Sequence, residues 1–194
     1  MGSIRIIAGR FRGRVLRVPD VAGLRPTGNR VREALFNILG QDLAGRAVLD
    51  LYAGTGALGL EAVSRGSPRA VFVESDRTLA QGLRRAAEAL GVAGSVRVVA
   101  GRVEDVLRAG TIRGSFDVVL ADPPYGAVEP QALADAVAGA DVLSPGGVLV
   151  LETGAAKGPL VPPRALRLMR SERYGGTTLL FFKYPNPGSC GEES

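Results

Sequence analysis

Four consecutive residues, Asp122-Pro123-Pro124-Tyr125, could together hold and activate an amino group on a planar ring. Proline fixes the backbone and lacks an N–H, so the chain presents carbonyl oxygens here as acceptors. Asp122 and the carbonyl of Pro123 can then accept both hydrogens of one NH₂ group. Tyr125 offers an aromatic face on which a base can stack. The alternative is a Pro-Pro turn without a catalytic role.

An amino group on a nucleic-acid base is a weak nucleophile, because its lone pair is delocalised into the ring. Two acceptors polarise the nitrogen toward a tetrahedral geometry, so positioning and electrostatics can suffice and Asp122 need not be a strong general base. The base has to leave its stack to reach such a site, and a stacking tyrosine favours that step. The run therefore indicates group transfer to an exocyclic amine.

A glycine-rich run, Gly54-x-Gly56-x-x-Gly59, follows a predicted strand and precedes a predicted helix. Glycines let the backbone approach a ligand closely, and the amides at the start of a helix point toward it. Glu74 stands 20 residues after Gly54, where a carboxylate can accept both hydroxyls of a ribose. On this pattern alone, a nicotinamide-dependent oxidoreductase is permitted.

Asp50 distinguishes between the ligands that this loop could hold. It lies four residues before Gly54, inside the predicted strand, and a carboxylate there would repel a pyrophosphate but attract a cation. The α-amino group of S-adenosylmethionine is such a cation. Two other interpretations stay open, because Asp50 could cap a helix or turn and Gly59 could serve only the close packing of helix on strand.

These motifs need an α/β framework, and the periodicity of the apolar residues predicts one. From Ala47 onward, short apolar runs alternate with helical patterns, which is typical of a doubly wound, mostly parallel sheet. The predicted core strands are Ala47–Tyr52, Ala70–Glu74, Val96–Ala100, Phe116–Ala121 and Gly147–Thr153. The predicted helices are Leu58–Arg65, Thr78–Leu90, Val103–Ala109 and Gln131–Ala138. Both motifs then fall at carboxyl ends of strands, where open α/β sheets bind ligands.

Smaller elements are predicted on either side of this core. Ile4–Ala8 and Val15–Val18 are expected strands, and Asn29–Leu39 is an expected amphipathic helix. Leu166–Arg173 and Thr177–Lys183, parted by two glycines, indicate a closing hairpin. On the helix, the side chains expected to point away from the apolar face are Arg30, Arg32 and Glu33. We thus expect a basic N-terminal extension (1–40), a main domain (41–184) and a disordered tail (185–194).

Positive charge is concentrated at the N-terminus. The chain has 194 residues and a formal net charge of +5, yet residues 1–32 hold eight arginines and one aspartate. The planar fork of arginine suits bidentate contacts with phosphates and guanine edges, so this segment is expected to contact a nucleic acid. The candidate contacts are Arg10, Arg12, Arg14, Arg25 and Arg30. The alternative is a genome of biased base composition that favours arginine over lysine.

Composition excludes several chemistries. The chain has no histidine, which removes Ser-His-Asp triads, Cys-His pairs and imidazole bases. Its one cysteine, Cys190, can form neither an internal disulfide nor a cysteine metal cluster. No apolar run is long enough to span a bilayer. We expect a soluble, cytoplasmic protein without a metal site.

The run from Asp50 to Gly59 resembles the glycine motif of the Rossmann-like class I methyltransferases, and the Asp122 run resembles the signature of their amino-group-methylating members. The N-terminal segment narrows the choice. Arg5-Ile-Ile-Ala-Gly9, then Arg25-Pro-Thr27 and Arg30-Val-Arg32-Glu-Ala-Leu-Phe36-Asn37, are similar to the RsmD family of small-subunit ribosomal RNA guanine-N2 methyltransferases. Tyr174-Gly175-x-Thr177-x-Leu179 matches the closing hairpin of that family, so the resemblance covers nearly the whole chain.

The resemblance implies an α/β, Rossmann-like fold with helices on both faces of a mostly parallel seven-stranded sheet. The last strand would be antiparallel and inserted beside the sixth. The implied reaction is methyl transfer from S-adenosylmethionine to guanine N2 in 16S ribosomal RNA. The implied partner is ribosomal RNA or the small subunit, bound by a monomer.

The resemblance also implies a set of contacts with the cofactor. The methionine moiety would be lined by Asp50, Gly54 and Gly56, the ribose by Glu74 and the adenine by Gly101, Arg102 and Val103. The residues that would border the cofactor carboxylate and the entering RNA are Arg25, Pro26, Thr27 and Arg30. Arg102 departs from the family pattern, since a short polar or acidic residue often stands there and arginine cannot accept a hydrogen bond. The adenine is therefore expected to be held by backbone groups or by Glu104.

Three other functions stay open. An adenine-N6 methyltransferase acting on RNA or DNA would keep the same site and change only the base. A non-catalytic ribosome-assembly module would use the basic arm alone, although the intact Asp122–Tyr125 run argues against it. A nicotinamide oxidoreductase would be recognised by the cofactor that raises its melting temperature.

Overall fold

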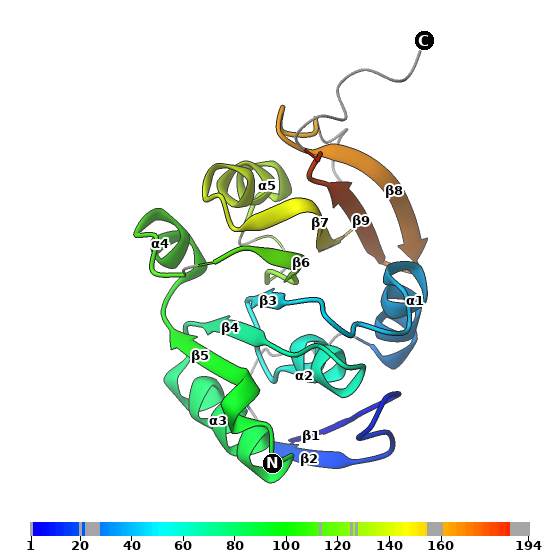
Figure 1. The fold of residues 1–194 in the computed structure, drawn as a ribbon, viewed down its shortest axis with the longest axis vertical. Helices are drawn as coiled ribbons and strands as arrows, with labels where there is room; N and C mark the ends of the chain where they lie inside the picture. Colours follow the sequence, from blue (N-terminus) through cyan, green and yellow to red (C-terminus); the bar gives the residue numbers. More distant parts are fainter. Residues whose placement is uncertain are drawn as a thin grey trace.

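A seven-stranded sheet with the order β5-β4-β3-β6-β7-β9-β8 forms the centre of the protein (Figure 1). The computed structural model describes residues 2–19, 21, 28–112, 114–124, 126, 128–154 and 161–186. Strands β3 to β7 are parallel, whereas β9 pairs antiparallel with both β7 and β8. The strands are β3 Val48–Leu51, β4 Ala70–Glu74, β5 Val96–Ala100, β6 Phe116–Ala121, β7 Leu143–Gly154, β8 Arg167–Tyr174 and β9 Thr177–Lys183.

Helices cover both faces of the sheet, because successive side chains of the central strands β3, β4 and β6 point to opposite faces and both sets are apolar. Three helices pack on one face: α1 Asn29–Leu39, α2 Ala57–Ser64 and α3 Arg77–Ala89. Two pack on the other: α4 Val103–Arg108 and α5 Pro130–Gly139. The carboxyl ends of the parallel strands are thus bordered by the starts of α2, α3 and α4.

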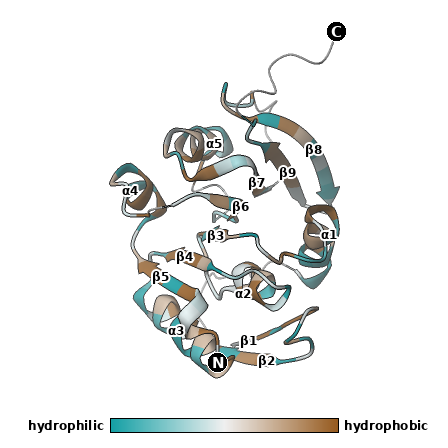
Figure 2. Cartoon of the chain, viewed as in Figure 1, coloured by the Kyte–Doolittle hydropathy of each residue, from teal (hydrophilic) through white to brown (hydrophobic). Residues whose placement is uncertain are grey.

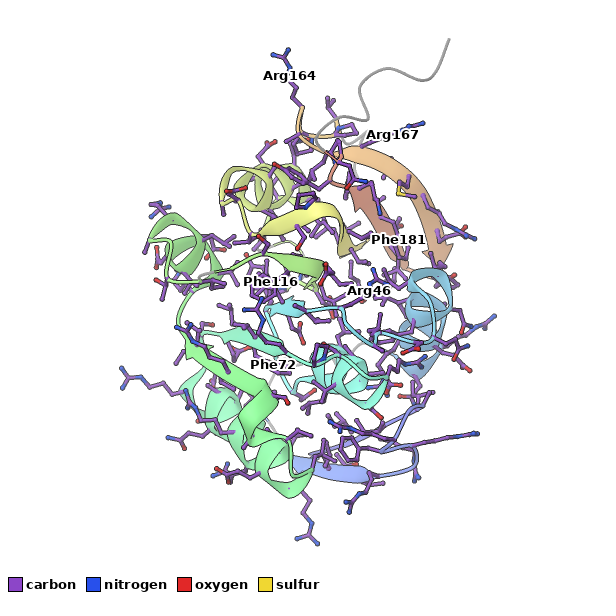
Figure 3. The ribbon with its side chains drawn as sticks, in the orientation of Figure 1. Arg46, Phe72, Phe116, Arg164, Arg167 and Phe181 are labelled. Carbon is purple, nitrogen blue, oxygen red and sulfur yellow. The ribbon has the colours of Figure 1, made fainter. Side chains whose placement is uncertain are left out.

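The side chains show the same layering. Phe72, Phe116 and Phe181 point into the packed layers, whereas Arg164 and Arg167 point outward (Figure 3). Strand β8 forms one edge of the sheet and carries hydrophilic residues along much of its length (Figure 2).

The N-terminal segment forms an antiparallel hairpin, β1 Gly2–Arg5 and β2 Val15–Val18, outside the main sheet (Figure 1). Its apolar residues pack against α2 and α3. The expected strand Ile4–Ala8 ends earlier, at Arg5. The amides of Ile7 and Ala8 donate instead to the carboxylate of Glu61, a fully buried residue of α2, at 2.8 and 2.9 Å.

Gly9 lets the hairpin loop lie directly on α2. Its φ is +79°, and a Cβ at this position would collide with the carbonyl oxygen of Ser64. The Ser64 hydroxyl donates to the carbonyl of Ala8 at 2.6 Å and accepts the amide of Phe11 at 3.0 Å. The loop is therefore fixed on the helix, while the arginine side chains that it carries are exposed; these are Arg10, Arg12 and Arg14.

Arg32 is buried, which corrects the expectation that it points away from the protein. It is 2% exposed, and its Nη2 donates to the carbonyl of Arg5 at 2.7 Å and to Oδ1 of Asn29 at 2.9 Å. Burial lowers the pKa of Arg32, although the charge of Glu61 opposes this shift. Arg32 thus ties the hairpin to α1. The apolar periodicity missed this contact, because a long side chain at the flank of a helix can turn into a polar gap between elements.

The expected fold class is confirmed, including the last strand inserted beside the sixth. Strand β7 begins at Leu143, earlier than expected, because Leu143 pairs with Phe116 ahead of an irregularity in the ladder. The expected disordered tail falls almost wholly outside the described residues. In the part of the chain that is described, no helix is long and apolar enough to cross a membrane.

Candidate active site

A cavity of about 930 Å³ lies at the carboxyl ends of the parallel strands. Its lining combines the glycine loop after β3, the loop after β5 and the residues that follow β6. The charged side chains of this lining are Asp50, Glu74, Arg102, Glu104, Asp122 and Glu152. Carboxylates therefore dominate the cavity.

Four of these acids come from four neighbouring strands and share one face of the sheet. Asp50 lies in β3, Glu74 ends β4, Asp122 follows β6, and Glu152 lies near the end of β7. The residues two positions before them all pack toward the α1–α3 layer: Val48, Phe72, Leu120 and Val150. Because side chains alternate along a strand, the four carboxylates project from that same face. Such a row attracts cations and amino groups and repels phosphates.

Glu74 holds the glycine loop to the neighbouring strand. Its carboxylate accepts the amide of Gly54 through Oε2 and the amide of Asp76 through Oε1, both at 2.7 Å. Gly56 has a φ of +81°, which favours glycine, and forms the turn into α2 without lining the cavity. At Gly59, a Cβ would collide with the ring of Phe72, so this glycine serves the packing of helix on strand.

Asp50 lies beneath the loop and is 1% exposed. Burial raises the pKa of Asp50 well above its ordinary range; the amide of Gly59, which donates to Oδ2 at 2.8 Å, opposes this shift, and the charges of Asp122 and Glu74 add to it. A cation in the cavity would favour the ionised form. Asp50 therefore satisfies an amide at the start of α2 and lines the cavity as well.

A linked group of side chains lines the cavity beside α4. The Tyr52 hydroxyl donates to Oε1 of Glu104 at 2.7 Å, and Nε of Arg102 lies 3.6 Å from Oε2 of Glu104. Partial burial raises the pKa of Glu104, but the hydrogen bond from Tyr52 and the charge of Arg102 outweigh it and lower that pKa. Tyr52 has a φ of +58°, a strained value for a tyrosine. A carboxylate has about four lone-pair sites, so Glu104 can accept a further hydrogen bond.

The residues after β6 reach the same cavity. Asp122, Pro123 and Pro124 line it, and Asp122 is near enough to Asp50 for their charges to interact. Tyr125 lies outside the described residues, so its stacking role stays a prediction. The same holds for the expected contacts that precede α1, which are Arg25, Pro26 and Thr27.

Most of the other expected site residues are described. The expected cofactor contacts that line the cavity are Asp50, Gly54, Glu74, Gly101, Arg102 and Val103. Arg30 is exposed in the first turn of α1, close in sequence to Gly28 and Val31, which line the cavity. The exposed arginines of the hairpin loop do not line it.

Several lining residues were not predicted from the sequence. Glu152 could have been found, because Val148, Val150 and Glu152 alternate along one face of a predicted strand. The contributions of α1 and of the β8–β9 turn leave no local pattern, since they depend on how distant segments pack. These contributions are Gly28, Val31, Gly176 and Thr177.

Comparison with known proteins identifies the family. A family model described as Conserved hypothetical protein 95 matches residues 4–183. Ribosomal RNA small subunit methyltransferase D from Haemophilus influenzae is 35% identical over 175 residues, which cover 90% of this chain and 90% of that protein. The chain belongs to the RsmD family. This result confirms the resemblance carried by the N-terminal motif and the closing hairpin, and it makes the chain a methyltransferase.

Solved structures agree with this family. The putative methyltransferase yhhF from Escherichia coli has a TM-score of 0.86 at 34% identity, covering 96% of this RsmD-family chain and 100% of that one. An RNA methyltransferase from Salinibacter ruber, solved in complex with S-adenosyl-L-homocysteine, has a TM-score of 0.60 at 20% identity, covering 88% and 100% of the two chains. This second likeness concerns the fold, which is that of the Rossmann-like methyltransferases.

Proposed function

We propose that this RsmD-family chain transfers a methyl group from S-adenosylmethionine to the exocyclic N2 of a guanine in small-subunit (16S) ribosomal RNA. The observation that carries the proposal is that Asp122 and Pro123 line the same cavity as Asp50, Gly54 and Glu74. The two proposed acceptors of the amine hydrogens thus share a cavity with carboxylates that suit a cationic cofactor. The relative from Haemophilus influenzae is named as a small-subunit ribosomal RNA methyltransferase, which supports the class of substrate.

The cavity suits S-adenosylmethionine better than a dinucleotide. Among its described lining residues, five carboxylates stand against Arg102 as the one cation. S-adenosylmethionine carries a sulfonium and an amino group, which carboxylates attract, whereas they repel a pyrophosphate. In our assignment Asp50 holds the amino group, Glu74 the ribose hydroxyls and Glu104 the adenine. The balance of charge argues against a nicotinamide-dependent oxidoreductase.

The catalytic work of the chain is to hold and polarise the target amine. The cofactor supplies an electrophilic methyl group when bound. Asp122 and the carbonyl of Pro123 accept the two hydrogens of the amine and turn its lone pair toward that group. Positive charge develops on the nitrogen during transfer, and two fixed acceptors stabilise it without having to reorient. Asp122 can then take the proton that the nitrogen releases.

The hairpin loop is the proposed contact with RNA. Its backbone is fixed on α2 by Glu61 and Ser64, so its exposed arginines are presented at defined positions instead of on a flexible arm. Arg30, exposed in the first turn of α1, is a further proposed contact with RNA, and Tyr125 is assigned to stack on the flipped base. We propose that the protein acts as a monomer in the cytoplasm.

Labelling with and without Asp122 tests the proposal. Unmodified small ribosomal subunits are incubated with methyl-labelled S-adenosylmethionine and either the parent protein or its Asp122→Ala variant. We expect label in the RNA with the parent protein and a loss of about 10²- to 10³-fold with the variant, while the affinity for the cofactor is kept. Asp135→Ala, at an exposed position of α5, is the matched control. Normal labelling by Asp122→Ala would refute its role, and no labelling by the parent protein would favour the non-catalytic assembly module.

A further inference from the structure

Glu152 is a buried carboxylate that the chemistry proposed above does not use. It is 4% exposed and lines the cavity. Its side chain projects from the same face of the sheet as that of Val150, which packs in the cluster beneath α1. Because a carboxylate that lines a ligand cavity can accept hydrogen bonds from the ligand, the place of Glu152 calls for a functional explanation.

Strand order separates Glu152 from the proposed cofactor contacts. Those contacts lie in or just after β3, β4 and β5, whereas Asp122 follows β6 and Glu152 lies in β7, one strand further on. Asp122 therefore stands between Glu152 and the glycine loop in the order of the sheet. A ligand group in contact with Glu152 therefore belongs to the base that accepts the methyl group and not to the cofactor.

The register sets Glu152 beside Asp122. Ala121 pairs with Leu151 in the parallel ladder, and Asp122 and Glu152 are the residues that follow directly. Neighbouring strands lie about 4.8 Å apart, so the backbones of Asp122 and Glu152 are direct neighbours where β6 and β7 meet the cavity. Such a pair can accept hydrogen bonds from two neighbouring donors of one planar ring.

Guanine carries such a pair of donors. Its Watson–Crick edge presents N1–H beside the N2 amine, whereas adenine presents an N1 lone pair beside the N6 amine. A carboxylate accepts but does not donate, so a carboxylate opposite N1 attracts guanine and repels adenine. Enzymes that act on a flipped base recognise it through hydrogen bonds to this edge.

We infer that Glu152 selects guanine by accepting N1–H while Asp122 holds the N2 amine. This inference rests on the proposed function, since it names the residue that separates a guanine-N2 enzyme from an adenine-N6 enzyme with the same Asp-Pro-Pro run. Gly28 and Val31 of α1 and the β8–β9 turn line the same cavity. The base is thus held between elements that lie far apart in the sequence.

A base analogue separates recognition from a purely structural role. In 2-aminopurine the amine at C2 is kept, but N1 carries a lone pair in place of a proton. Small subunits are reconstituted with ribosomal RNA that has either guanine or 2-aminopurine at the methylated nucleotide, and kcat/KM is measured for each. We expect the parent protein to prefer guanine by roughly 10- to 150-fold, the contribution of one hydrogen bond to a charged group.

The Glu152→Gln variant should lose most of that preference, because an amide can donate to the N1 lone pair as well as accept N1–H. Cofactor affinity and melting temperature should stay near those of the parent protein. Glu172→Gln, on the edge strand β8 and away from the cavity lining, is the matched control and should keep the preference. An unchanged guanine preference in Glu152→Gln would overturn the inference.

A second variant covers the case in which Glu152→Gln does not fold. Glu152→Asp keeps the charge but withdraws it by one methylene, so kcat/KM for guanine should fall while guanine stays preferred, and an unchanged kcat/KM would overturn the inference. Failure of the proposed function would look different. The parent protein would then label adenine N6, whereas label on guanine N2 with the preference unaltered by Glu152→Gln refutes only the role of Glu152.

Discussion

Replacing Glu61 with alanine should detach the N-terminal hairpin from the methyltransferase core. Glu61 is fully buried in α2, and its carboxylate accepts the amides of Ile7 at 2.8 Å and Ala8 at 2.9 Å. It also forms an ion pair with Nε of Arg65 at 2.9 Å, with side chains 0% and 2% exposed. One substitution thus removes the acceptor for three donors and leaves the charge of Arg65 buried without its carboxylate.

The size of the effect follows from this geometry. Breaking a buried ion pair by removing one partner costs about 3–5 kcal/mol of unfolding free energy. For a chain of 194 residues, each kcal/mol lowers the melting temperature by about 2–4 °C. We therefore expect Glu61→Ala to lower it by roughly 6–20 °C.

Differential scanning calorimetry measures this shift, and the exposed Glu88 of α3 supplies the control Glu88→Ala, which should change the melting temperature little. Hydrogen exchange at the amides of Ile7 and Ala8 should speed up in Glu61→Ala before the core amides do. A melting temperature within 2 °C of the parent protein would mean that the buried pair does not hold the hairpin.

Three further changes test the docking, the cofactor site and the RNA surface. Gly9→Ala should lower the melting temperature by several degrees, because φ is +79° and the methyl group would collide with Ser64; an unchanged value would contradict the close contact. Asp50→Asn should weaken S-adenosylmethionine binding about tenfold or more in calorimetry. The pKa of Asp50 is higher in the folded protein than in the unfolded chain. The folded state therefore loses stability as pH rises from the ordinary carboxyl pKa through the raised pKa of Asp50. Without ligand, the melting temperature of the Asp50→Asn variant should therefore rise relative to that of the parent protein as pH rises. A difference in melting temperature that does not change with pH would contradict the burial of an ionisable Asp50. Removing the three exposed arginines of the hairpin loop should lower the slope of log affinity for RNA against log salt by about 2 for single strands and about 3 for a duplex. The matched triple variant takes exposed arginines on or just before β8, the edge strand away from the hairpin and α3, which are Arg164, Arg167 and Arg170; equal slopes in the two variants would move the RNA surface elsewhere.

The centre of the parallel sheet could be predicted from the sequence because its strands β3, β4 and β6 bury both faces. Such strands appear as continuous apolar runs between turn residues, and β4, β5, β6 and β9 lie where the apolar runs predict them. The docking of the hairpin could not be predicted in this way. Glu61 sits in a helical pattern that gives no sign of full burial, and the amide of Ile7 that it binds lies 54 residues away.

The candidate site likewise combines residues that the sequence predicts with residues that it does not predict. The acids at the ends of β4 and β6 were predictable, because parallel strands bring their carboxyl ends to one edge. Nothing in the local sequence marks Tyr52 as a site residue, because its bond to Glu104 joins residues 52 positions apart. Contacts of this range depend on how loops meet after folding, so local spacing does not encode them.

The identity of the methylated nucleoside distinguishes guanine N2 from adenine N6 as the target of this protein. Unmodified small ribosomal subunits are incubated with the protein and methyl-labelled S-adenosylmethionine, the RNA is digested to nucleosides, and the labelled product is compared with authentic standards. Our account predicts N2-methylguanosine. N6-methyladenosine would contradict the assignment of guanine while keeping the amine chemistry, and label on a ribose or a ring carbon would contradict the role given to Asp122 and Pro123.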